Sequence, residues 1–385
     1  MLKTTPFHER TSALCESHAW RRWAGHVVAS AYELSHEHEY HAIRSAAALF
    51  DVSPLCKYRI SGRDAAKLLD RVVTRNIAKL AVGQVAYTPW CDARGKVLDD
   101  GTVARLEPDV FRMTSAEPSL RWLEANADGL DVTVEDVSGA LAALSLQGPT
   151  SRAILGNIDL RYFRLVETTF AGVPVSISRT GFTGDLGYEI WLRAEDALRV
   201  WDALIDAGRA YGITPAGMLA LDVARIEAGL MLLDVDYVSA RKALIDSQTS
   251  TPFELDLAWA VDLGKETFVG RAALAEQAAR GPEWRFVGIE IDWNSLEQLY
   301  AEAGLATHVP SAAWRMSVPL YSRGEQVGYA TSGVWSPLLK RYIALAHVRG
   351  EPGELEIEFT VEHRRRRAKA SLAKKPFFDP ERKRK

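Results

Sequence analysis

The sequence predicts an α+β fold with largely antiparallel sheets, followed by a smaller all-β domain at the C-terminal end. Two observations carry this prediction. Segments with helical spacing of apolar residues alternate with short runs rich in β-branched and aromatic residues, without the regular βα period of a parallel sheet. From residue 286 onward, strand patterns replace the helical spacing.

The helical and strand-like segments of the first 275 residues are of ordinary length. The last expected helix ends in Gly212, a residue type that terminates helices because it adopts a left-handed conformation without strain. Short runs with β-propensity separate the helices. The expected helices are 64–73, 118–127 and 195–212, and the expected strands are 57–62, 83–90 and 173–178.

A domain boundary is expected at 276–285, where a polar stretch containing Gly and Pro resembles an inter-domain linker. Residues 1–275 are then expected to form one region with two interleaved subdomains, and 286–385 a β-barrel or sandwich. In the second part, 354–361 alternates acidic and apolar residues, as an edge or half-exposed strand does. The basic run 363–369 is expected to be a solvated hairpin turn and tail, and attraction of an anionic ligand is the alternative.

Composition and charge are those of an ordinary globular protein. Hydrophobic residues make up 47% and charged residues 25% of the 385 residues, and the formal net charge is −3. No nucleic-acid or membrane partner is therefore expected. Three cysteines in no disulfide or metal spacing indicate a reducing compartment. Because no signal peptide or bilayer-spanning run is recognisable, a cytoplasmic location is expected.

Several common site motifs are absent from the sequence. There is no dinucleotide fingerprint, phosphate loop, nucleophile elbow or paired CxxC. The nearest metal-like string is HEHEYH at 36–41, in which His38 and His41 share a helix face at a spacing of three. We expect these to be ordinary exposed or pocket-lining histidines and expect no metal, with a metal site as the alternative.

Several ordered segments carry a resemblance that spans almost the whole chain. They are TTPFHER near the N-terminus, SAAALFDVS (45–53) with ISGRDA (60–65), the stretch 73–103, RTGFTGDLGYEIW (179–191), ALDVARIEAGLMLLDVDY (220–237), FVGRAAL (268–274) and TSGVWSPLLKRYIALAHV (331–348). Together they resemble the glycine-cleavage T-protein, or aminomethyltransferase, family, which includes folate-dependent demethylases. The resemblance implies a three-lobed ring of folate-binding domains with a C-terminal β-barrel, an aminomethyltransferase-like region at 1–275, and one-carbon transfer with tetrahydrofolate as cofactor.

Two carboxylates match the family's central site residues. Asp100 matches the family's catalytic aspartate. A carboxylate beside a reduced pterin can orient the nucleophilic amine and exchange a proton with it, which gives this role a physical reason. Its neighbour Asp99 alternates to the other face of the strand and is expected to be structural. Glu189 matches the pterin-binding glutamate, whose carboxylate accepts two parallel N–H donors from the aminopyrimidine edge.

Four further residues are assigned to the channel by the resemblance. Arg225 is expected to contact the folate, and Tyr87 to line the channel beside the catalytic aspartate. Tyr188 is a cofactor-binding candidate that is equally compatible with a core position. Leu55 stands where the family has a folate-facing methionine. For these residues, salt-bridge or core roles are the structural alternatives.

Departures from the family pattern gather at the donor end. WAGHVVASAY at 23–32 lacks the family's Trp, Met and Pro, and Pro54–Cys56 replaces its His-Met-Gly. Because the pterin anchors are kept, we expect a demethylase that moves a methyl group from an aryl methyl ether, a sulfonium or a methylamine to tetrahydrofolate. One alternative is an aminomethyltransferase that acts with a lipoyl carrier protein. The second alternative is a folate-binding protein without transfer chemistry.

Candidate substrate contacts follow from that expectation. His26, Tyr32 and His41 lie in or near the altered stretch and are candidates for a general acid or for contacts with the donor. Trp90 and Trp335 are candidates for an aromatic wall beside a planar or cationic donor. Ordinary core positions are the alternative for each of them.

Overall fold

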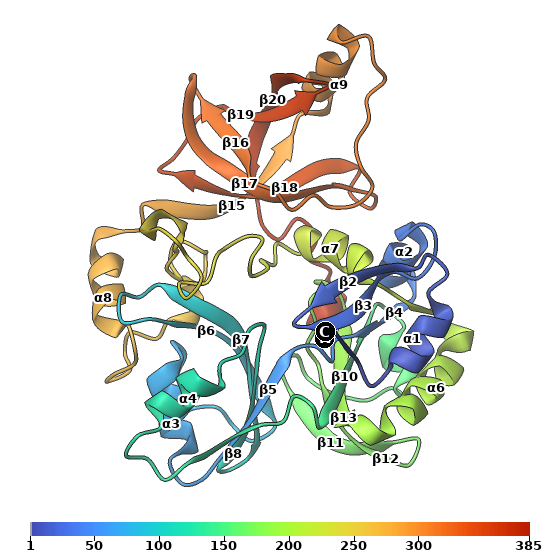
Figure 1. Ribbon diagram of the computed structural model, residues 1–385, viewed down its shortest axis with the longest axis vertical. Coiled ribbons are helices and arrows are strands. Elements are labelled where there is room, and N and C mark those ends of the chain that lie inside the picture. The colour runs from blue at the N-terminus through green and yellow to red at the C-terminus, as the bar shows by residue number, and fades with distance from the viewer. Residues whose placement is uncertain (1) are drawn as a thin grey trace.

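The computed structural model describes residues 2–385, which fold into three lobes arranged as a triangle (Figure 1). Two lobes each contain an open sheet packed against helices, and the third is a closed barrel. Strand pairing within the sheets is almost entirely antiparallel, so the predicted α+β class with a C-terminal barrel is confirmed. No helix within 2–385 has both the length and the apolar character needed to cross a membrane.

The first lobe contains a five-stranded antiparallel sheet and two helices. Its elements are β5 (Cys56–Ser61), α3 (Ala65–Val72), β6 (Gln84–Cys91), β7 (Val97–Glu107), β8 (Val110–Ser115), α4 (Leu120–Asn126) and β9 (Thr133–Asp136). The strand order is β6-β7-β8-β5-β9. Leu68, Leu69 and Val72 of α3 bury against Phe111 and Met113 of β8, which explains the helical spacing of this segment.

The second lobe contains a six-stranded sheet in the order β11-β12-β13-β10-β4-β14, with only β14 pairing in parallel. Trp201 and Leu204 of its longest helix pack in the core of this lobe, and Gly212 ends the following 3₁₀ turn at φ 71°. Its elements are β4 (Ala47–Asp51), β10 (Leu141–Gln147), α5 (Ser151–Ile154), β11 (Leu165–Phe170), β12 (Val173–Ser178), β13 (Gly187–Arg193), α6 (Ala197–Gly208), β14 (Ile213–Pro215) and α7 (Met218–Glu227).

A small three-stranded sheet formed by the N-terminal segment lies beside the second lobe (Figure 1). Its strand order is β1-β3-β2, and β1 pairs with β3 in parallel. Two helices belong to the same segment, and one of them packs against α7. The elements of this segment are β1 (Lys3–Thr4), α1 (His8–Leu14), β2 (Ala19–Trp23), β3 (His26–Ala31) and α2 (Glu37–Ser45).

The third lobe is a six-stranded barrel closed in the order β15-β18-β17-β16-β19-β20. Its strands are β15 (Trp284–Ile291), β16 (Val318–Ser322), β17 (Glu325–Ser336), β18 (Arg341–Arg349), β19 (Leu355–Val361) and β20 (Arg364–Ala373), and α9 (Trp293–Glu302) packs on β20. The closure leaves β19 with a neighbour on both sides, so its acidic and apolar alternation marks a barrel strand and not an edge strand. The helix α8 (Arg271–Arg280) precedes β15, and only three residues connect the two.

The basic run 363–369 begins at a hairpin turn, as expected, but it continues as a strand of the barrel and not as a tail. The hairpin turns at residues 362–363, and the arginines continue as β20. Arg365 and Arg367 pair with Glu358 and Glu356 across the hairpin at 3.7 and 3.8 Å. These arginines therefore form ion pairs with carboxylates of the barrel itself.

Two buried carboxylates connect the barrel to the second lobe. Glu227 at the end of α7 binds Arg44 at 2.6 Å and accepts a hydrogen bond from Ser336 of β17 at 2.5 Å. Asp236 accepts one from Ser332 of β17 at 2.7 Å. Because a buried charge that loses its partner costs several kcal/mol, these contacts fix how the lobes meet.

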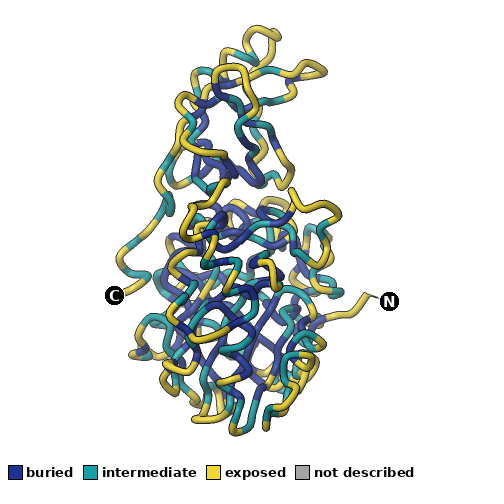
Figure 2. The backbone as a smooth tube through the Cα atoms, turned by 90° about the vertical axis from the view of Figure 1, so that its left-hand side faces the viewer, coloured by how far each residue is buried: buried dark blue, intermediate teal, exposed yellow. Residues whose placement is uncertain are grey.

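The segment that follows β20 also joins two lobes. Figure 2 shows it leaving the barrel and running down the outside of the molecule. The Phe378 amide donates to the Glu227 carbonyl at 2.9 Å, and Arg382 binds both oxygens of Asp185 at 2.6 and 2.8 Å. This segment therefore fastens the barrel to the second lobe from outside.

Candidate active site

The face of the first sheet turned away from α3 and α4 carries a group of polar residues. In the pairing of β6 with β7, Tyr87 lies opposite Thr102 and Pro89 lies opposite Asp100. Tyr87 and Asp100 are therefore diagonal neighbours on one face, within reach of each other's side chains. The structure brings these two predicted residues together.

Two tyrosine hydroxyls orient the Asp100 carboxylate. Tyr237 donates a hydrogen bond to its Oδ1, and the Tyr87 hydroxyl also donates toward it. Burial raises the pKa of Asp100 above its ordinary value, although the two hydroxyls act in the opposite direction by stabilising the charged form. Tyr237 was not a sequence-based candidate.

The neighbouring carboxylate has a structural position. Asp99 is fully buried on the other face of β7, and its two oxygens accept the backbone N–H groups of Asp100 and Glu117 at 2.8 and 2.9 Å. Burial raises the pKa of Asp99 strongly, with Asp100 as the next contribution. Asp99 thus holds the backbone that carries Asp100, as strand alternation predicts.

Gly101 sets the distance between β7 and β8 beside this site. A Cβ at this position would lie 2.0 Å from the carbonyl oxygen of Thr114, which belongs to the backbone of β8. The next residue, Thr102, is joined to Thr114 by a hydrogen bond of 2.7 Å between their hydroxyls. Only glycine permits this close approach, which fixes the strand that presents Asp100.

An aromatic platform adjoins the aspartate. The rings of Tyr87 and Trp259 stack with centroids 5.8 Å apart and planes 25° apart. The Arg75 guanidinium lies 5.5 Å from the Trp259 centroid, and the indole is 61% exposed. An exposed indole held in this way can stack on a planar ligand. Trp259 lies in a short 3₁₀ helix (Ala258–Ala260) and Arg75 in a loop, and sequence patterns gave no signal for either.

Glu189 lies on the inner face of the second lobe. Strand alternation in β13 turns it away from α6, and it pairs in register with Ser145 of β10. The Thr180 hydroxyl donates to its Oε2 at 2.5 Å. Burial raises the pKa of Glu189, and the Thr180 hydroxyl and the positive charge of Arg112 partly counteract that effect. The carboxylate retains unused acceptor positions for a ligand.

Arg225 is completely buried behind the site. Its guanidinium pairs with Asp236 and, at 3.4 Å, with Asp222. Asp236 precedes Tyr237, the residue that donates to Asp100, so Arg225 holds that tyrosine indirectly. One nitrogen, Nη2, is buried without a hydrogen-bond partner. Because Arg225 is 0% exposed, its position is that of a supporting residue behind the site, and the expected direct contact with folate is not open to it in this structure.

Leu55 lies in the loop between β4 and β5. Its side chain joins the apolar cluster that also includes Tyr87 and Tyr237, and its carbonyl accepts a hydrogen bond from the Lys57 ammonium at 2.9 Å. The structure therefore places this predicted residue in the same cluster as the site tyrosines.

Two predicted aromatic residues point away from the site, which corrects their assignment. Tyr188 is fully buried in the core of the second lobe, on the opposite face of β13 from Glu189, and accepts a hydrogen bond from Arg152 at 3.2 Å. Trp90 is fully buried in the core of the first lobe, on the α3 side of β6. In both cases the alternation of a strand decides the direction of the side chain.

The donor-side candidates make their contacts with groups other than Asp100. His26 contacts the Ala24 carbonyl of its own hairpin at 3.1 Å, and Tyr32 is buried beside a cavity of about 10 Å³ that Asp51 also lines. His41 is exposed on α2, and Trp335 packs on Trp293 in the barrel with ring centroids 4.8 Å apart. Within residues 2–385, none of these four residues forms a hydrogen bond or ring contact with Asp100 or its two tyrosines.

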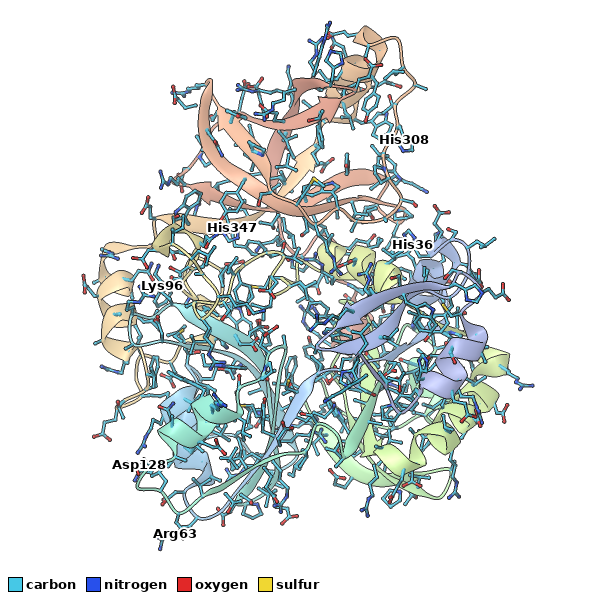
Figure 3. The ribbon with its side chains drawn as sticks, in the orientation of Figure 1. His36, Arg63, Lys96, Asp128, His308 and His347 are labelled. Carbon is cyan, nitrogen blue, oxygen red and sulfur yellow. The ribbon has the colours of Figure 1, made fainter. Side chains whose placement is uncertain are left out.

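The histidine string 36–41 does not converge on one point. His36 contacts the Ser311 carbonyl at 3.2 Å, where α2 approaches the barrel (Figure 3), and His38 pairs with Glu33 at 2.9 Å. Across residues 2–385, no group of three or more His, Cys, Asp or Glu side chains has the spacing of a metal site. His347, on the side of the barrel that meets the other lobes, contacts the carbonyl of Asp236 at 2.6 Å.

Two family models cover most of the chain. The GCVT N-terminal domain matches residues 7–265, and the glycine cleavage T-protein C-terminal barrel domain matches residues 303–379. The chain belongs to the glycine-cleavage T-protein family. The predicted family is thereby confirmed, and the chain is a folate-dependent transferase of that family.

Individual relatives agree with the family models. The chain is 34% identical to an aminomethyltransferase of Geobacillus thermodenitrificans over 352 residues, 88% of this chain and 89% of the relative. It is 33% identical to an aminomethyltransferase of Halothermothrix orenii over 98% of this chain and all of the relative. The crystal structure of glycine cleavage system aminomethyltransferase T from Bartonella henselae superposes with a TM-score of 0.83 at 25% identity, covering 98% of this chain and 99% of that chain.

Proposed function

We propose that this chain is an aminomethyltransferase, which takes a one-carbon unit from an aminomethyl-lipoyl carrier protein and passes it to tetrahydrofolate. The observation that carries the proposal is the presence of two buried carboxylates on different lobes: Asp100, held by Tyr237 and Tyr87, on the first lobe, and Glu189 on the second. The relatives described above bear the same activity in their names. They give no support to the demethylase that the donor-side departures had favoured, so the stated alternative replaces it.

The contacts of the three predicted donor-side acids give no support to an ether demethylase. Cleavage of an aryl methyl ether needs a general acid beside the leaving oxygen. The candidates for that acid were His26, Tyr32 and His41. His26 contacts the Ala24 carbonyl, Tyr32 is buried, and His41 is exposed on α2. An aminomethyl thioether needs no such acid from these positions, because the amine nitrogen can assist departure of the sulfur.

The residues of the two inner faces fit a reduced folate. Glu189 offers a carboxylate with free acceptor positions for the paired N–H donors of an aminopyrimidine. Trp259 and Tyr87 offer a stacking surface beside Asp100. Bound there, tetrahydrofolate supplies the amine nitrogens that accept the carbon.

Asp100 has the properties of a proton acceptor for this transfer. Its carboxylate is held by Tyr237 and Tyr87, so it can face an amine in one fixed orientation. A folate amine that bonds to the donor carbon would displace the carrier sulfur and give up a proton, which Asp100 would accept; closure of the methylene bridge onto the second amine would release ammonia. Burial raises the pKa of Asp100, which makes it a better proton acceptor than an exposed carboxylate.

Product analysis under anaerobic conditions tests the proposal. The protein is incubated with tetrahydrofolate and one donor at a time, and folate products are identified by mass. The donors are an aminomethyl-loaded lipoyl carrier, a sulfonium, an aryl methyl ether and a methylamine. We expect methylene-tetrahydrofolate from the carrier only, and loss of this product in Asp100→Asn. A methyl-tetrahydrofolate product from a small donor would restore the demethylase interpretation.

A further inference from the structure

Arg112 is a buried cation without a bonded partner. It lies in the middle of β8, pairs in register with Arg59 of β5 and Ala104 of β7, and projects from the inner face of the first sheet. The residue is only 6% exposed, yet its guanidinium forms no hydrogen bond or ion pair with any group in residues 2–385. Burial lowers its pKa to about 10, and Glu167 and Glu189 act on it only from a distance.

Other buried arginines of this protein differ from Arg112 in this respect. Arg44 is bonded to Glu227 at 2.6 Å, and Arg225 to Asp222 and Asp236. These two arginines show how the fold ordinarily pairs a buried guanidinium. The nitrogens of Arg112 are not among the unpartnered atoms that are closed off from water, so its N–H groups can be reached from the cavity that it lines. The partner that would compensate Arg112 is therefore to be sought outside the chain.

The surroundings of Arg112 form a cavity between the first two lobes. The cavity has a volume of about 320 Å³, within the range of sites for small molecules. Most of its walls are apolar and come from both lobes, among them Leu106 from the first and Leu141 and Val175 from the second. The Arg112 guanidinium lies 4.3 Å from the centroid of Trp191, a contact that holds the cation at the wall and leaves its N–H groups free.

The other charged groups of the cavity are already engaged or exposed. Arg59 pairs with Glu135 at 3.0 Å, and Arg193 pairs with Glu195 at 3.2 Å, both with largely exposed side chains. Glu167 is exposed on β11 and gives the opening an acidic group. Arg112 is thus the cation of this cavity that is both buried and free to bind an anion.

We propose that this inter-lobe cavity is a binding site for a small planar organic carboxylate, anchored by Arg112. The fork of N–H donors on a guanidinium matches a carboxylate with two parallel hydrogen bonds. The apolar walls cover the flat body of such a ligand, whereas an inorganic anion would leave them bare. A singly charged ligand also suits an opening that carries Glu167. The proposal does not depend on which one-carbon donor the enzyme uses.

Calorimetric titration of the folate-free protein tests this site. The probes are benzoate and its neutral analogue benzamide, which share a planar body but differ in charge. We expect benzoate to bind at least about tenfold more tightly than benzamide, because a hydrogen bond to a charged group is worth about 1.5–3 kcal/mol. Equal affinities of the two probes would overturn the proposal without any mutation.

Two variants locate the binding. Arg112→Leu should weaken benzoate at least about tenfold. Arg193→Leu, which removes an exposed arginine of the same cavity wall, should leave benzoate affinity within about twofold, since exposed pairs contribute little. Circular dichroism checks that Arg112→Leu folds, and Arg112→Gln replaces it if it does not. Benzoate affinity that survives both Arg112 variants, or that Arg193→Leu abolishes, would refute the assignment.

Discussion

Replacing Tyr237 by Phe removes one of the two hydroxyls that stabilise the charged form of Asp100. A hydrogen bond to a charged group contributes about 1.5–3 kcal/mol, and each pKa unit corresponds to about 1.4 kcal/mol. The lost hydroxyl stabilised the carboxylate, so its removal raises the already raised pKa of Asp100 further. If catalysis needs the ionised carboxylate, then lowering the pH abolishes the activity of the variant at a higher pH than it does for the unmodified enzyme.

The expected result is an acid limb of the pH–rate profile shifted upward by about one to two pH units. The rate is measured as methylene-tetrahydrofolate formed from the loaded carrier, and Tyr211→Phe, at a 42% exposed position, serves as the control. The high-pH plateau should change less than the limb. An unshifted acid limb in Tyr237→Phe, at full folding, would refute the role assigned to the Tyr237–Asp100 pair.

Three further substitutions have calculable outcomes. Glu189→Gln should weaken tetrahydrofolate roughly ten- to hundredfold by calorimetry, because a charge-assisted pair of hydrogen bonds is lost; unchanged affinity would exclude it as the pterin anchor. Gly101→Ala places a Cβ 2.0 Å from the Thr114 carbonyl, so it should lower the free energy of unfolding by about 1–3 kcal/mol in urea titration and reduce turnover; wild-type values for both would contradict the packing argument. Glu227→Gln should cost up to about 3–5 kcal/mol in the same titration, because it removes the nearer of the two buried carboxylates that pair with Arg44 and leaves only Asp185 at 3.4 Å; a loss below about 1 kcal/mol would show that the Arg44–Glu227 pair matters little.

Much of the fold was predictable from local patterns. The helical spacing of 64–73 and 118–127 corresponds to α3 and α4, and the turn at Gly212 ends the segment begun by α6. Strand period also separates Asp100 from Asp99 in the way the sequence implies. These features follow from neighbours in sequence, which is the information a single chain contains.

The period of two would also have corrected two assignments. Tyr188 precedes Glu189 directly, so the two cannot face the same side of β13. Trp90 is three residues from Tyr87 in β6 and therefore lies on the opposite face. Both were selected for residue type and not for direction, and both are core residues.

Other parts of the site were beyond sequence reasoning. Tyr237 reaches Asp100 from a loop, and Trp259 reaches Tyr87 from a short 3₁₀ helix. The loop of Tyr237 is held by the buried pair of Arg225 and Asp236 and by the hydrogen bond from Ser332 of the barrel to Asp236. The contacts of Tyr237 with Asp100 and of Trp259 with Tyr87 each join residues that are more than a hundred positions apart in the sequence. The donor-side departures misled for the same reason, because His41 lies on an exposed helix face that the sequence alone did not orient.

A crystal structure of the protein with a stable reduced folate tests the central claim most directly, namely that Asp100 and Glu189 on two lobes serve one folate. We expect the Glu189 carboxylate to accept hydrogen bonds from the aminopyrimidine N–H groups. The Asp100 carboxylate should lie within hydrogen-bond distance of the amine nitrogens that receive the carbon. A folate bound with either carboxylate out of contact, for instance in the cavity beside Arg112, would contradict the account.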